Sequence, residues 1–153
     1  MNEIAQRYAQ ENVASIFLYT HEAHPGENYP HLTSMEQKLR HAHDLRVKIG
    51  VERPILVDSL DGACHRAYGS NPNMSWIISN SGIPVYKSDW TDAGSVESAI
   101  AYLIYVLKRR RNGERLAQFH VERADFRTQD HKAFYAGLER NGPKAVKEFS
   151  EAF

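Results

Sequence analysis

Cysteine is almost absent from this sequence, since Cys64 is the only one among 153 residues. A single cysteine excludes an internal disulfide, a Cys-x-x-Cys redox pair and a cysteine-rich zinc site within one chain. The sequence also lacks a glycine-rich phosphate loop and a Gly-x-Ser-x-Gly nucleophile elbow. Several common classes of enzyme are excluded by these absences alone.

An excess of charge of either sign is also absent, because 19 Lys and Arg residues balance 19 Asp and Glu residues. A field that attracts nucleic acid or a membrane surface across the whole molecule is therefore not expected. No apolar run approaches the roughly 20 residues that span a bilayer, and the N-terminus is too polar for a signal peptide. We expect a soluble, cytoplasmic protein with no nucleic-acid partner and no membrane partner.

Strand and helix patterns alternate through the first two thirds of the chain, which is typical of an α/β fold. Short apolar runs predict four strands, over residues 13–20, 54–58, 74–79 and 83–88. An Asn-Ser-Gly turn at 80–82 predicts that the last two form an antiparallel hairpin. Helical spacing of apolar residues predicts helices over residues 2–12, 34–49, 60–69 and 95–111.

Two overlapping capping boxes precede the second of these helices. Thr33 and Ser34 are each followed three positions later by Glu or Gln, which is a signature of a helix N-terminus. We expect this helix to bury its apolar residues, namely Met35, Leu39, Ala42, Leu45 and Ile49.

The pattern after Gly113 becomes purely helical, with helices expected over 114–126, over 129–140 and from Pro143 onward. We therefore divide the chain into an α/β domain at 1–112 and a helical C-terminal extension at 113–153. The extension has more apolar residues than a solvated tail needs, so we expect it to pack on the same domain or across a homodimer. These residues are Leu116, Phe119, Phe126, Phe134, Tyr135, Leu138 and Phe149.

Three segments resemble one known family. The stretch FLYTHEAHP at 17–25, the helix at 34–45 and the residues Ala67-Tyr68-Gly69 followed by Pro72 are similar, in order and spacing, to segments of iodothyronine deiodinases. The likeness is greatest to bacterial members of this branch of the thioredoxin-like superfamily, and it covers roughly residues 5–107.

The resemblance implies a thioredoxin-like mixed sheet flanked by helices, truncated at its N-terminal strand. In the family that strand leads to the selenocysteine or cysteine nucleophile, and here it would lie before Met1. The chain is then either a fragment of a longer reading frame or a relative that has lost the nucleophile. We expect the remaining strands to close into a four-stranded mixed sheet, with Pro72 in the place of the superfamily's cis-proline.

The resemblance also assigns candidate site residues. Glu22 and His24 match family residues that assist substrate handling and proton transfer, while His31, Tyr68 and Pro72 match binding positions. Cys64 does not align with the nucleophile, although His65 and Arg66 beside it leave a reactive thiol open as a weaker alternative. A buried, unreactive thiol is the simpler interpretation.

The function expected from these features is that of a deiodinase-like redoxin, a reductive oxidoreductase family, inactive alone because the nucleophile is absent. Its partners would be a small aromatic or peroxide-like substrate and a thiol reductant, with no cofactor. One alternative is a non-catalytic module that binds a small ligand or assembles with a partner. A less favoured alternative is a metal-dependent enzyme that uses loop residues His21, Glu22, His24 and His31.

Overall fold

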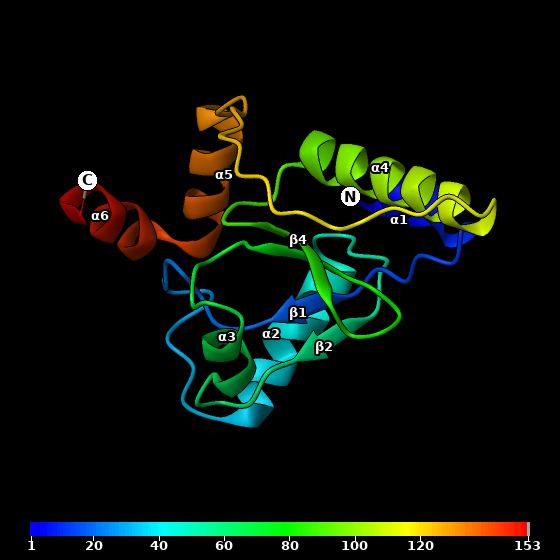
Figure 1. The fold of residues 1–153 in the computed structure, drawn as a ribbon. Coiled ribbons are helices and arrows are strands. Elements are labelled where there is room, and N and C mark those ends of the chain that lie inside the picture. Colours follow the sequence, from blue (N-terminus) through cyan, green and yellow to red (C-terminus); the bar gives the residue numbers. More distant parts are fainter. Residues whose placement is uncertain (153) are drawn as a thin grey trace. The chain divides into compact units, whose positions relative to one another are not determined.

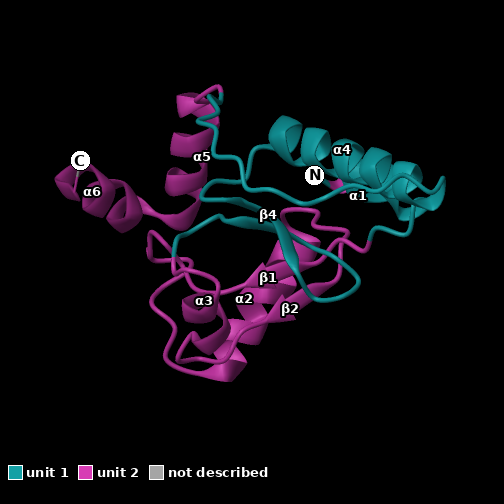
Figure 2. Cartoon of the chain, in the orientation of Figure 1, with its two compact units in different colours: residues 1, 3–13, 71–127 teal, residues 2, 14–70, 128–153 magenta. Residues whose placement is uncertain are grey.

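The computed structural model describes residues 1–152 and has a mixed α/β architecture (Figure 1). Its contacts divide the chain into two compact units (Figure 2). Unit 1 contains residues 1, 3–13 and 71–127, and unit 2 contains residues 2, 14–70 and 128–153. No helix among the described residues is long and apolar enough to cross a membrane.

Unit 1 is built from two helices and a β-hairpin. Helix α1 (Asn2–Ala9, all but its first residue in this unit) and helix α4 (Ala93–Arg111) share an apolar core of Ile4, Val96 and Ile100. Strands β3 (Ser75–Ile78) and β4 (Pro84–Ser88) supply partly buried side chains that pack against this core. The expected antiparallel hairpin is confirmed, with Gly82 in the left-handed conformation at its turn.

Unit 2 has a small parallel sheet at its centre. Strand β1 (Phe17–Tyr19) pairs with strand β2 (Ile55–Val57), and helix α2 (Met35–Val47) packs beside β2 (Figure 1). The short helix α3 (Ala63–Ala67) follows β2 along the chain.

The expected four-stranded mixed sheet is wrong, because the described strands pair in two separate two-stranded sheets. Strand β1 is also shorter than the apolar run at 13–20 predicts. Its ladder begins where the amide of Phe17 donates to the carbonyl of Pro54 at 2.8 Å. Pro54 has no N–H to donate, so the ladder cannot extend in that direction. The structure is therefore α/β in class, while a thioredoxin-like sheet remains an expectation.

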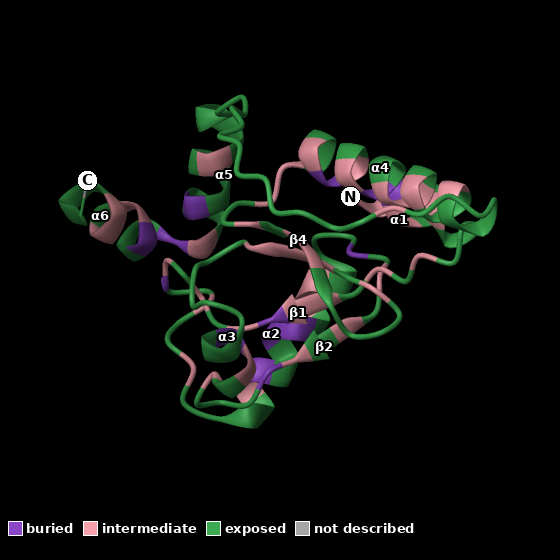
Figure 3. Ribbon diagram, in the orientation of Figure 1, coloured by how far each residue is buried: buried purple, intermediate pink, exposed green. Residues whose placement is uncertain are grey.

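Helix α2 starts where the capping boxes predict, but the face that it buries is only in part the expected one. The Ser34 hydroxyl accepts a hydrogen bond from the amide of Gln37 at 3.2 Å, which confirms the N-cap. The predicted core residues Met35, Leu39 and Ile49 are exposed. Ala42 is buried as expected, and Lys38 and His41 are buried beside it. The spacing i, i+3, i+4 of these three residues defines one face of the helix (Figure 3).

The C-terminal segment forms two helices, α5 (His131–Asn141) and α6 (Pro143–Ala152). The helix expected over 114–126 does not form, and this segment has no regular secondary structure. Its aromatic side chains have nothing to pack against, since Phe119 is 79% exposed and Phe126 is 96% exposed. A helix this short is marginal in water without a packed face, which explains the difference from the prediction.

The turn between α5 and α6 docks on the loop that follows β1. The Asn141 side chain donates to the carbonyl of His24 and accepts from the amide of Tyr29 at 2.9 Å. The Glu27 carboxylate accepts from the amide of Lys144, in the first turn of α6, at 3.1 Å from each oxygen. We call this set of contacts the loop clamp; it ties residues 24–29 to the last two helices.

Gly26 provides a test of the loop clamp, because a Cβ atom there would clash with the carbonyl oxygen of Asn141. We expect Gly26→Ala to lower the free energy of unfolding by about 1–3 kcal/mol, as for other overpacked sites. Gly137→Ala is the matched control, since position 137 lies in α5 with open space around it. We expect it to stabilise the protein by about 0.5–1 kcal/mol through helix propensity. Urea unfolding of both variants measures the difference, and equal stabilities would contradict the clamp.

Candidate functional site

An open groove lies along helix α2 and the loop before it, with a volume of about 720 Å³. His41 is its buried member, at 8% exposure, while the other lining residues are half-buried or exposed. Most of the lining residues are of polar type, and they are Asn28, Pro30, Glu36, Gln37, Leu39, Arg40, His41, His43 and Asp44. A groove with a buried histidine is a candidate ligand site because it combines access with a titratable group.

His41 belongs to a buried chain of hydrogen bonds that we call the Tyr19 network. The Tyr19 hydroxyl donates to the carboxylate of Glu22 and lies 3.2 Å from Nδ1 of His41. Because a hydroxyl has one hydrogen and gives it to Glu22, it accepts from a protonated Nδ1 of His41. The Glu22 carboxylate is 3.6 Å from the same nitrogen. A proton can therefore move between the carboxylate and the histidine through adjacent donors and acceptors.

The Tyr19 phenol stays neutral over the physiological range. Burial, and then the hydrogen bond with Glu22, raise the pKa of Tyr19 above its ordinary value.

Tyr29 supports the other side of the network, since its ring packs edge-on against the His41 ring with centroids 5.0 Å apart. The Tyr29 hydroxyl donates to the Asp44 carboxylate at 3.1 Å, which fixes that ring at the side of the groove.

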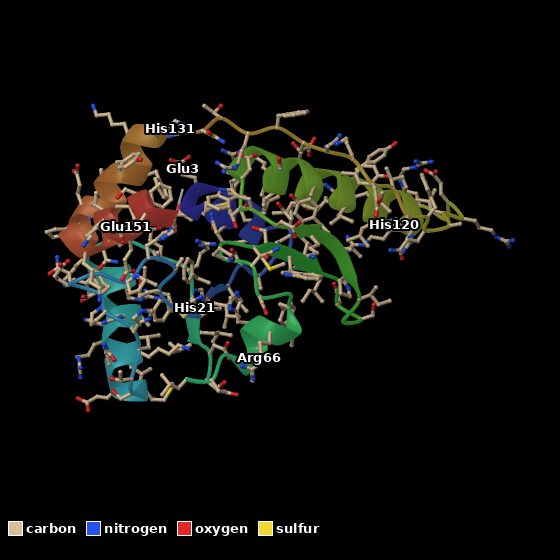
Figure 4. All side chains as sticks on the ribbon, turned by 90° about the vertical axis from the view of Figure 1, so that its left-hand side faces the viewer. Glu3, His21, Arg66, His120, His131 and Glu151 are labelled. Carbon is tan, nitrogen blue, oxygen red and sulfur yellow. The ribbon has the colours of Figure 1, made fainter. Side chains whose placement is uncertain are left out.

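A second polar group lies at the carboxyl ends of β1 and β2, where α/β proteins commonly bind ligands. The rings of His21, after β1, and His65, on α3, have centroids 4.8 Å apart. Lys38 is only 1% exposed, and its Nζ donates to the carbonyl of Ser59 at 2.8 Å. We call His21, Lys38, Asp58 and His65 the histidine cluster; Figure 4 labels His21 together with Arg66 of α3.

Asp58 is the anchor of this cluster. Its carboxylate accepts from the amides of Ser59 at 2.8 Å, Cys64 at 3.0 Å and His65 at 2.9 Å. Burial alone would raise the pKa of Asp58, but these backbone hydrogen bonds outweigh it and the pKa is lowered. The bonds hold the start of α3 against the end of β2.

The two residues expected to act together, Glu22 and His24, have separate surroundings. Glu22 joins the Tyr19 network beside the groove. The His24 ring packs edge-on against Phe134 and Phe149, with centroid distances of 6.0 and 5.4 Å. His24 therefore contacts the C-terminal helices through the loop clamp, while Glu22 contacts β1 and α2.

The other expected residues are spread over the chain. Cys64 is half-buried in α3, and its amide rather than its thiol has a defined partner in Asp58. Tyr68 is the C-cap of that helix, and His31 is exposed, with a carbonyl that accepts from Gln37 at 3.3 Å. Pro72 belongs to unit 1, and its peptide bond is trans.

The loop residues do not gather as a metal site would require. His21 faces His65, Glu22 bonds to Tyr19, and His24 packs against aromatic rings. Between residues 1 and 152, no three His, Cys, Asp or Glu side chains lie close enough together to hold a metal ion. The metal-dependent alternative is left without support.

Sequence reasoning missed the residues that bring the site together, namely Lys38, His41 and Asp58. Two signals could have found them. Lys38 and His41 are three positions apart on the predicted helix, so they share a face. Asp58 comes directly after an apolar strand, at the edge of a parallel sheet where polar residues collect around ligands.

The Asp58 contacts lead to a stability prediction. Asn has one acceptor oxygen where Asp has two, so Asp58→Asn leaves at least one buried amide facing an amide NH₂. We expect the free energy of unfolding at pH 7 to fall by about 2 kcal/mol, the cost of losing hydrogen bonds to a buried charge. Asp61→Asn is the control, because that carboxylate is exposed and bonds to the Ser59 and Arg66 side chains near the surface rather than to buried amides.

Wild type and Asp58→Asn also test how the stabilisation by the Asp58 carboxylate depends on pH. Because the pKa of Asp58 is lowered by folding, its stabilisation is complete above the unfolded value of about 3.9 and is lost as pH falls through the folded value. The gap between wild type and Asp58→Asn should therefore be constant from pH 5 to 8 and narrow below about pH 4. A gap that persists unchanged at pH 2.5 would contradict the charged hydrogen-bond anchor.

Comparison with known proteins adds no relative to this description. No protein-family model matches the chain, and neither a curated protein nor a solved structure matches it. Function is therefore inferred from the residues of the groove, the Tyr19 network and the histidine cluster.

Proposed function

We propose that the chain is a deiodinase-like redoxin domain that binds a small aromatic or peroxide-like molecule and supplies proton-transfer groups, without a reducing nucleophile of its own. The observation that carries this proposal is the Tyr19 network. Tyr19 and Glu22 both belong to the segment whose sequence resembles the deiodinases, and they connect to His41 beside an open groove.

The chemistry that these groups can supply is general acid–base catalysis. A reductive cleavage needs a proton at the carbon or oxygen that the leaving group vacates, as well as two electrons from a thiol or selenol. His41, hydrogen-bonded to Tyr19 and close to Glu22, is placed to give such a proton. The electrons need a nucleophile and a reductant, and Cys64 has neither a second cysteine nor a place beside the groove lining. We infer that the isolated chain has no turnover.

A second candidate function, a binding or assembly module, is favoured by the same absence of a nucleophile. The groove and its polar lining would then serve recognition alone. Both candidates predict ligand binding at His41, and they differ in whether a thiol or selenol supplied by another protein restores chemistry. The lone cysteine also agrees with a cytoplasmic location, where disulfides are rare.

A binding and activity experiment tests this proposal. We expect 4-iodophenol to shift the ring NMR signals of His41 and Tyr29 saturably, and Leu39→Arg, which fills the groove from an exposed position, to abolish the shift. Leu56→Arg is the matched control, since Leu56 is also exposed and lies on β2 outside the groove. No saturable shift in wild type would reject an aromatic ligand at this groove.

Turnover is measured in the same samples as iodide release with dithiothreitol. We expect none above the background without protein, in wild type and in Cys64→Ser alike. Iodide release that Cys64→Ser abolishes would show that Cys64 is a nucleophile and would overturn the proposal that the chain lacks one.

A further inference from the structure

The buried ammonium of Lys38 has more hydrogen-bond donors than acceptors. An ammonium group donates three hydrogen bonds, yet among the described residues only the carbonyl of Ser59 accepts from it. A buried charge without matching partners is costly. Two donors of a side chain that is 1% exposed therefore need acceptors that the described chain does not provide.

Asp58, the carboxylate of the cluster, does not accept a hydrogen bond from Lys38. Its two oxygens are occupied by three backbone amides. No direct ion pair joins it to Lys38, whereas the exposed Lys48, the C-cap of α2, has one, at 2.7 Å from Asp44. A ligand with anionic oxygens would supply the acceptors that Lys38 lacks.

The neighbours of Lys38 indicate the charge of that group. The imidazoles of His21 and His65 face each other 4.8 Å apart, and both gain positive charge when protonated. His21 is exposed, so the cluster is open to solvent on that side. Positive groups gathered around unsatisfied N–H donors favour an anionic oxygen ligand over a neutral or cationic one.

We propose that the histidine cluster is an oxyanion site, in which the Nζ of Lys38 and the ring of His21 bind the carboxylate or phosphate group of a small molecule that enters past His21. The position agrees with this, because the cluster lies at the carboxyl ends of two parallel strands. The site is separate from the groove at His41, and the inference does not depend on the proposed deiodinase-like function.

The charged groups around His21 set the direction of its response to an anion. In the free protein, burial, then His65 and then Lys38 lower the pKa of His21, while Glu22 opposes this. Asp58 and Asp61 act on Lys38 and favour its charged form. An anion held beside His21 counters the repulsion from Lys38 and His65, so binding should raise the pKa of His21 and should be tighter at pH 6 than at pH 8.

The experiment follows the histidine ring signals of the full chain by NMR while sodium sulfate or sodium acetate is added at constant ionic strength, with chloride as the balancing salt. Wild type should show a saturable shift of the His21 ring and a higher pKa for it. Preference for sulfate indicates a phosphate-type ligand, and preference for acetate a carboxylate. Lys38→Met should weaken binding at least tenfold, and Lys48→Met, at the C-cap of α2, should leave it unchanged.

Two results overturn the inference: no saturable shift in wild type with either anion, or equal binding by wild type and Lys38→Met. If Lys38→Met does not fold, His21→Asn decides, with binding followed at the neighbouring His65 ring. Position 21 is exposed, and the loss of its ring must weaken binding. The iodophenol experiment follows the ring signals of His41 and Tyr29, whereas the anion experiment follows the ring of His21. If the protein binds anions but not iodophenol, the oxyanion site stands and the proposed function is rejected. If it binds iodophenol but not anions, the proposed function stands and the oxyanion site is rejected.

Discussion

The burial of polar side chains on one face of α2 is the constraint on which the rest of unit 2 depends. Lys38 and His41 are buried where the sequence offers apolar alternatives such as Leu39, which the helix leaves exposed. Buried polar groups must find partners, and these do so at the ends of the two parallel strands. Lys38 reaches the carbonyl of Ser59 after β2, and His41 reaches the hydroxyl of Tyr19 at the end of β1. The helix is thereby fixed to both strands by specific contacts.

The loop between β1 and α2 needs a second support, because it contains Glu22 and His24 and has no regular structure. The loop clamp provides this support from the C-terminal helices. Asn141 bonds to both ends of the segment, at the carbonyl of His24 and the amide of Tyr29. Tyr29 in turn packs on His41. The C-terminal helices are therefore connected, through one loop residue, to the histidine that borders the groove.

The sequence predicted local features well and long-range pairing poorly. The Ser34 cap and the β3–β4 hairpin depend on residues close in the chain, and both are confirmed. The four-stranded sheet depended on pairings between distant segments, which apolar runs cannot specify, and it was wrong. The helix at 114–126 failed because spacing alone does not show whether a packing surface exists for Phe126.

For the site, the sequence led to Glu22 but not to its partners. Histidines and lysines on a predicted helix are ordinarily solvated, so nothing in the pattern marked Lys38 and His41 as buried. Lys38 and His41 differ from an exposed residue such as His43 only in that they lie against the ends of β1 and β2. The expected grouping of Glu22 with His24 rested on their spacing in an extended segment, and the contacts of His24 with Phe134 and Phe149 replace it.

The arrangement of α2 on the two strands depends on the burial of the Lys38 ammonium at the strand ends. The most direct test is the pKa of that amine, measured by an NMR titration of lysine side chains labelled with ¹³C at Cε and assigned with Lys38→Met. Burial disfavours the charged form, and the pKa of Lys38 is accordingly lowered in spite of Asp58 and Asp61. We expect Lys38 to titrate below the ordinary lysine value of about 10.4. Titration at or above that value would contradict a buried ammonium and, with it, the arrangement of α2 on the two strands.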